Sequence, residues 1–72
     1  MHQITPIIYE INGEFAGYVA ELPGATGQGR TIDDVLDELR LAVAELVDEY
    51  QSRNLPVPWR KIVISEPLSI SA

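Results

Sequence analysis

The chain has 72 residues, no cysteine and one histidine, and its eleven acidic against five basic residues give a net charge of −6. This length fits a single domain, residues 1–72, whose core is worth only roughly 3–5 kcal/mol, so such domains often add a disulfide, a metal or a partner subunit. The absence of cysteine excludes disulfides and thiolate metal sites. Self-association is then the remaining common way to stabilise such a small core. The negative charge disfavours direct nucleic-acid binding and favours a basic partner.

No apolar run approaches the roughly 20 residues of a membrane span, and the N-terminus lacks the pattern of a signal peptide. The sequence therefore predicts a cytoplasmic protein that does not contact the membrane. The lone histidine, His2, leaves the serines without a general base. We therefore expect no enzymatic activity, no catalytic residue and no cofactor.

The first part of the chain predicts a β-hairpin. Residues Gln3 to Ile11 are rich in isoleucine and tyrosine, as strands are. Asn12-Gly13 is a strong hairpin signal, because a type I′ turn needs two residues with positive φ. The return strand is expected from Glu14 to Glu21, and its small residues leave room for close approach of another element, most simply the helix: Ala16, Gly17 and Ala20.

A turn and a third strand are expected next. Leu22-Pro23-Gly24 places proline and glycine at the two central positions of a type II turn. Ala25 to Arg30 contains two glycines and has weak strand propensity. Its position between a tight turn and a helix nevertheless favours a short third antiparallel strand.

The longest predicted element is a helix from Ile32 to about Ser52. Thr31 and Asp34 have the spacing of a capping box. Asn54 is a good left-handed cap, and two prolines follow it. Apolar residues recur at three- and four-residue spacing and form one stripe: Ile32, Val35, Leu36, Leu39, Ala42, Val43, Leu46, Val47 and Tyr50.

A fourth strand is expected at Lys61 to Ser65, whose sequence K-I-V-I-S is β-branched. Residues 66–72 fit either a further edge strand or a tail. The order is therefore β-β-β-α-β, an α+β fold with an antiparallel meander. Its fourth strand lies parallel to the first, giving sheet order 3-2-1-4 with one long helix on one face.

Self-association is expected at the sheet face that the helix leaves uncovered. The sequence does not decide which face that is, because both faces of the first strand carry apolar residues. We predict a closed two-fold dimer whose interface includes Ile4 and Ile8.

A second candidate surface lies on the solvent side of the helix. Leu41 falls about 180° from Ile32 at 100° per residue, and acidic residues surround it. A lone exposed leucine is ordinary, but one ringed by acids also suits a basic partner. The candidate partner-binding residues are Asp34, Asp37, Leu41, Glu45 and Asp48.

Two further clusters have alternative interpretations. Asp33, Asp34, Asp37 and Glu38 resemble a divalent-metal site in composition, but they also complement the helix dipole, and metal chemistry needs carboxylates from several elements. We therefore predict no metal site. Trp59 beside Arg60 and Lys61 suits either stacking on a partner or packing over the end of the core, and packing is the expected role.

The path from Tyr18 to Pro58 resembles the HicB family of bacterial antitoxins. The matching residues are Tyr18-Val19-Ala20, Leu22-Pro23-Gly24, Thr26, Gln28-Gly29, Thr31 with Asp34, Pro56 and Pro58. The resemblance implies a partial RNase H-like fold without nuclease activity. It also implies that the protein sequesters a small basic toxin of the HicA kind, which cleaves messenger RNA.

One departure from the family concerns the C-terminus. Many HicB antitoxins carry a DNA-binding module there, and residues 66–72 leave no room for one. Autoregulatory DNA binding is therefore not expected. The alternative function is a stand-alone HicB-like structural or regulatory domain with another partner.

Overall fold

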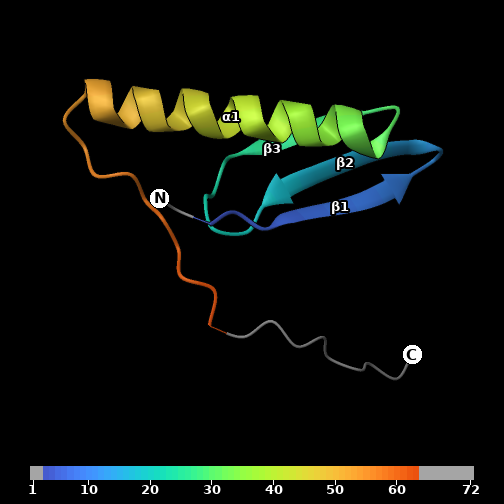
Figure 1. Cartoon of the computed structure of the whole chain (residues 1–72), viewed down its shortest axis with the longest axis horizontal. Helices are drawn as coiled ribbons and strands as arrows, with labels where there is room; N and C mark the ends of the chain where they lie inside the picture. The colour runs from blue at the N-terminus through green and yellow to red at the C-terminus, as the bar shows by residue number, and fades with distance from the viewer. Residues whose placement is uncertain (1–2, 64–72) are drawn as a thin grey trace.

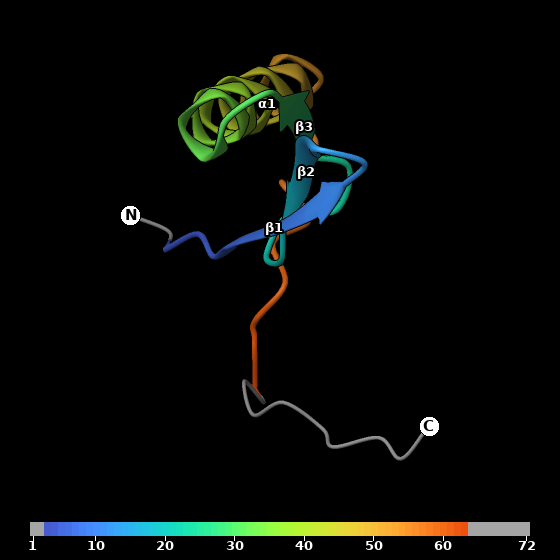
Figure 2. The ribbon, with the colours of Figure 1, turned by 90° about the vertical axis from the view of Figure 1, so that its right-hand side faces the viewer.

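The computed structural model describes residues 3–63 and shows an α+β arrangement of three antiparallel strands followed by one helix. The strands are β1 (Pro6–Ile11), β2 (Glu14–Val19) and β3 (Thr26–Gly29), and the helix is α1 (Ile32–Ser52). The sheet order is β1-β2-β3. Figure 1 shows α1 running along the sheet, nearest β3 and farthest from β1, and the end-on view in Figure 2 agrees.

The predicted hairpin is confirmed. Asn12 and Gly13 both have positive φ, 51° and 83°, as a type I′ turn requires. The register pairs Ile11 with Glu14 and Pro6 with Val19. Pro6 starts an edge strand, where its missing N–H costs no ladder hydrogen bond.

The predicted turn and third strand are also present. Gly24 has φ of 95°, and the N–H of Ala25 donates to the carbonyl of Leu22 over 3.2 Å, as a type II turn requires. The chain then enters β3, which pairs Gly27 with Gly17 of β2.

Glycines decide how closely α1 approaches the sheet. A Cβ built on Gly27 would lie 2.8 Å from the Cβ of Glu38, and one on Gly29 would lie 2.5 Å from the Cβ of Asp34. A Cβ on Gly17 would lie 3.2 Å from Val35 Cγ1. The helix backbone therefore rests almost directly on β3, because β3 presents no side chains to it.

The helix begins and ends as its sequence predicts. The hydroxyl oxygen of Thr31 accepts from the N–H of Asp34 over 3.1 Å. At the other end Asn54 has φ of 56°, and the N–H of Leu55 donates to the carbonyl of Tyr50 over 2.9 Å. This 6→1 bond is the mark of a Schellman motif, which satisfies carbonyls that the last turn leaves free.

The core lies between α1 and the sheet at the end nearest the L-P-G turn. Its fully buried members are Val19, Leu22, Ala25, Val35 and Leu39. Nine partly buried apolar residues pack around them: Ile4, Ile8, Phe15, Ala42, Val43, Leu46, Val47, Val57 and Trp59. The expected packing role of Trp59 is thereby confirmed.

The segment after the helix returns to the sheet at one point. The N–H of Arg60 donates to the carbonyl of Glu21 over 2.7 Å. Thr5 holds the same residue from the other side, with its N–H and hydroxyl donating to the Glu21 carboxylate over 2.7 and 2.6 Å. These bonds join the start of β1, the end of the hairpin and the connector that follows α1.

The fourth strand expected at Lys61 to Ser65 is not formed in the described part of the chain. Residues 61–63 belong to no strand, and residues 64–65 lie outside the described range, as do residues 66–72. The observed sheet is therefore the three-stranded meander alone.

Candidate protein-binding surfaces

The acidic helix face is exposed along its whole length. All five predicted residues are exposed, and the first of them lies on the flank of α1 that faces β3: Asp34, Asp37, Leu41, Glu45 and Asp48. Leu41 is 56% exposed at the centre of this face. The face therefore offers one apolar side chain within a row of carboxylates.

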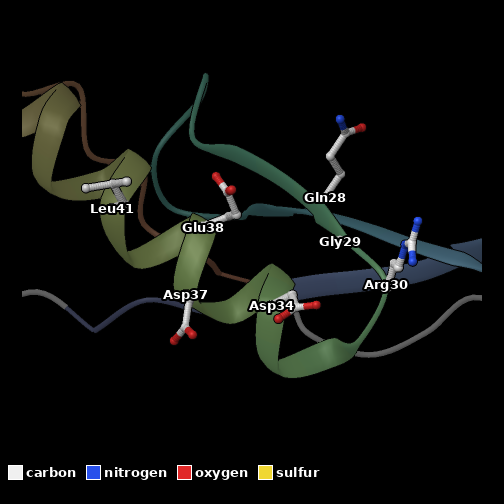
Figure 3. Close-up of a pocket in the computed structure, with 7 residues that line it drawn as sticks. All are labelled: Gln28, Gly29, Arg30, Asp34, Asp37, Glu38 and Leu41. Atoms are coloured by element: carbon white, nitrogen blue, oxygen red, sulfur yellow. The ribbon is translucent and has the colours of Figure 1, made fainter.

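A shallow groove of about 470 Å³ runs between this face and β3. Glu38 points from the helix toward the strand that carries Gln28, whereas Asp37 points away from it (Figure 3). The lining residues are Gln28, Gly29, Arg30, Asp34, Asp37, Glu38 and Leu41. Glu45 and Asp48 continue the acidic face beyond the groove toward the C-terminal end of α1.

Sequence reasoning missed the contributions of Gln28 and Arg30 to this groove. A usable signal was present in Gly27 and Gly29, because strand glycines often mark the close approach of another backbone. Placing the helix beside β3 brings the polar side chains of that strand to the acidic helix face.

The acids of the face are only partly neutralised. The guanidinium of Arg40 lies 3.0 Å from the Asp37 carboxylate, and both side chains are largely exposed. Exposed pairs of this kind contribute about 0–1 kcal/mol. Among the residues that the structure describes, Asp34, Glu45 and Asp48 form no ion pair. The face therefore keeps most of its negative charge for a partner.

The four carboxylates at the start of α1 do not converge. Within residues 3–63 no group of three or more histidine, cysteine or acidic side chains is placed to hold a metal ion. Asp33, Asp34, Asp37 and Glu38 all project from one helix, and the groove carries Arg30 at one end. Their arrangement fits an acidic helix start better than a cation cage.

A second exposed surface is the sheet face that α1 leaves uncovered. Alternation along β1 puts three apolar residues on this face, and β2 adds another: Ile7, Tyr9, Ile11 and Tyr18. Their exposed fractions lie between 38 and 55%. We call this set the open apolar face.

The predicted dimer residues Ile4 and Ile8 do not lie on the open apolar face. Both are half-buried and pack against the core on the side of α1, so they are not available to an interface on the uncovered face. The reason lies in the neighbouring strands: Gly17, Gly27 and Gly29 open the face that Ile8 shares, and the helix takes that face.

No helix in residues 3–63 combines the length and the apolar character needed to cross a bilayer. The chain matches no protein-family model, no curated protein and no solved structure. The interpretation of these surfaces consequently rests on their geometry and chemistry.

Proposed function

We propose that this protein is a non-catalytic, HicB-like binding module of the cytoplasm that sequesters a small basic protein. The supporting observation is the exposed leucine at the centre of an acidic helix face. Leu41 supplies an apolar anchor, and acids lie along the helix on both sides of it: Asp34 and Asp37 before it, Glu45 and Asp48 after it. The HicB resemblance in the turn, third strand and helix start makes a HicA-like, messenger-RNA-cleaving toxin the partner of choice.

In this proposal the negative charge of the chain sets the association rate, and the apolar contact of Leu41 sets the dissociation rate. A chain with net charge −6 attracts a basic protein over a distance and raises the association rate, most strongly at low salt. A buried apolar anchor slows dissociation, because hot-spot energy concentrates in the desolvated centre of an interface. Leu41 is the residue of the face able to act in that second way.

The complete fold is proposed to be the four-stranded, partial RNase H-like arrangement, with a fourth strand parallel to β1. The support is that β1 is an edge strand in the described sheet and that K-I-V-I-S has strand-forming composition. A filled β1 edge leaves the acidic face of α1, beside β3, free for the toxin.

The test is affinity purification of the tagged chain from its own cells, with two leucine variants compared. Leu41→Lys places a cation in the acidic face, whereas Leu55→Lys makes the same change at a 48%-exposed leucine beyond the helix. We expect the wild type and Leu55→Lys to retain one small basic protein and Leu41→Lys to retain roughly tenfold less or none, since tenfold corresponds to about 1.4 kcal/mol. The retained protein should cleave messenger RNA until one equivalent of the chain is added.

Other outcomes contradict the proposal in different ways. Equal retention by Leu41→Lys removes the helix face as the docking surface. A partner that is neither basic nor an RNA-cleaving protein supports the alternative, a stand-alone structural or regulatory domain. Magnesium-dependent RNA cleavage by the purified chain alone contradicts the non-catalytic assignment.

A further inference from the structure

The outer edge of β1 carries backbone groups that nothing in residues 3–63 pairs. The N–H of Ala20 donates to the carbonyl of Thr5 over 3.0 Å, so Thr5 occupies a hydrogen-bonded position opposite β2. Hydrogen-bonding direction alternates along an antiparallel pair. Ile7, Tyr9 and Ile11 therefore bond to β2, and the backbone of Ile8 and Glu10 points outward.

Such an edge is a template for another strand. It contains isoleucine, and beside it lies the open apolar face. Exposed edges of this kind are usually paired or protected in stable proteins. Pro6 protects only the first position, because it lacks an N–H.

The chain also carries a segment of strand-forming composition, beginning at Lys61, that is not part of the described sheet. After the Arg60 bond to Glu21, residues 61–63 leave the domain, and the connector descends away from β1 in both views (Figures 1 and 2). Ile62 is 43% and Val63 82% exposed. Strand pairing would satisfy both the unpaired edge of β1 and these two exposed β-branched side chains.

Charge favours this segment over a second β1 as the occupant. Arg60 and Lys61 supply two of the five basic residues in the chain, and β1 and its hairpin partner carry Glu10 and Glu14. Pairing β1 with β1 of another copy joins two strands that each carry Glu10 and no basic residue. Pairing β1 with the segment that follows Arg60 brings opposite charges together.

We infer that two copies of this chain exchange the segment that begins at Lys61, each pairing it with the β1 edge of the other. The exchange is reciprocal, as closed two-fold assembly requires. The exchange buries Ile62 and Val63 of both chains and completes two four-stranded sheets. The inference rests on the proposed fourth strand and is independent of the proposed basic partner.

The absence of cysteine from the sequence makes a direct test possible. Ile11→Cys labels the end of β1 and Val63→Cys labels the segment, and both positions are exposed. The two full-length single variants are mixed, equilibrated and treated with a short bismaleimide cross-linker. We expect a cross-linked heterodimer in the mixture and much less product from either variant alone. A control with Ala44→Cys, on the outside of α1, should give no heterodimer.

Each other outcome overturns the inference. A double variant that cross-links within one molecule, at a yield independent of dilution, shows that the chain fills its own edge. Ile11→Cys dimers formed as readily as heterodimers show pairing between two β1 strands. No heterodimer product at all excludes the exchange, whatever the oligomeric state.

Sedimentation gives a second readout that does not depend on cysteine. Val63→Asp should weaken dimerisation by about tenfold or more, since it replaces an apolar β-branched side chain of the exchanged segment with a charged residue that disfavours strands. Leu41→Lys should leave dimerisation unchanged. Circular dichroism verifies that each variant retains the wild-type fold. A Val63→Asp chain that dimerises like the wild type contradicts the inference.

Discussion

The two outer strands of the sheet have opposite compositions and opposite surroundings. β3 is the four residues T-G-Q-G, yet α1 covers it. β1 is P-I-I-Y-E-I, yet most of its residues are exposed and its outer edge is unpaired. Hydrophobicity alone predicts the reverse arrangement.

The difference shows that shape decides where this helix docks. Two glycines on β3 and Gly17 on β2 form a smooth strip, and α1 approaches it to within side-chain contact of Val35 and Glu38. Close packing of this kind gains dispersion contacts from backbone atoms as well as side chains. Ile7 and Ile11 of β1 are left exposed on the far face of the sheet, whereas Ile8 packs against the core.

The largest expected effect tests which side of α1 is buried. Leu39 is 1% exposed, and Leu39→Ala should cost about 2–5 kcal/mol, because it removes a core side chain and leaves a cavity. Urea unfolding monitored by circular dichroism measures this cost. Leu41→Ala, the same change on the opposite side of the helix, should stay within about 0.5 kcal/mol. Equal costs at the two positions contradict the observed helix orientation.

The second prediction tests the glycine strip directly. Gly27→Ala should destabilise the protein by about 1–3 kcal/mol, because its Cβ meets the Cβ of Glu38 at 2.8 Å and the two backbones must separate. Gln28→Ala, on the neighbouring residue, serves as the matched control and should be nearly neutral. A neutral Gly27→Ala shows that the helix does not rest on β3.

The third prediction concerns the start of α1, which holds the helix in line with β3. Thr31→Ala removes the oxygen that accepts from the Asp34 N–H and should cost about 1 kcal/mol. Thr31→Ser keeps that oxygen and should retain most of the stability. A loss as large for serine as for alanine excludes the capping bond as the cause. Thermal unfolding of the two variants measures the difference.

The smallest expected effect lies at the start of β1. Hydrogen bonding by the Thr5 hydroxyl, aided by backbone N–H donors, holds the pKa of the Glu21 carboxyl below its ordinary value of 4.5, although burial acts in the opposite direction. A carboxyl with a lowered folded-state pKa stabilises the fold above its unfolded-state pKa, and this contribution disappears as the pH falls through the folded-state value. Exposure of the site limits the contribution to a few tenths of a kcal/mol.

Glu21→Gln should therefore be slightly less stable than the wild type at pH 7, and the difference should shrink by about pH 3. Urea unfolding at the two pH values measures it. Thr5→Val removes the main donor and should reproduce the same pH dependence. A difference that grows toward low pH contradicts the assigned cause of the pKa shift.

Local signals in the sequence predicted most of the described fold. The Asn12-Gly13 turn, the Leu22-Pro23-Gly24 turn, and a helix with Thr31 as its N-cap all depend on neighbouring residues, and all are observed. The third strand has weak strand propensity, but its position between a tight turn and the helix start predicted it correctly. Local chemistry fixed these elements because each needs only a few adjacent residues.

Properties that depend on pairing between strands were harder to predict. The helix-covered face follows from Gly17 lying opposite Gly27, and only the register places these glycines together. The sequence therefore left the covered face undecided, and Ile4 and Ile8 pack on the side that the helix covers. Gln28 and Arg30 of the groove were missed for the same reason. The exposed acidic face of α1 was predicted because helical periodicity alone defines it.

Backbone hydrogen exchange at β1 tests the central claim, that the β1 edge is open in one chain and filled by a second copy. We expect the N–H groups of Ile7 and Tyr9 to be protected at all concentrations, because they bond to β2. Those of Ile8 and Glu10 should exchange quickly in dilute protein and become protected as the concentration rises. Protection of Ile8 and Glu10 that is independent of concentration, or absent throughout, contradicts the claim.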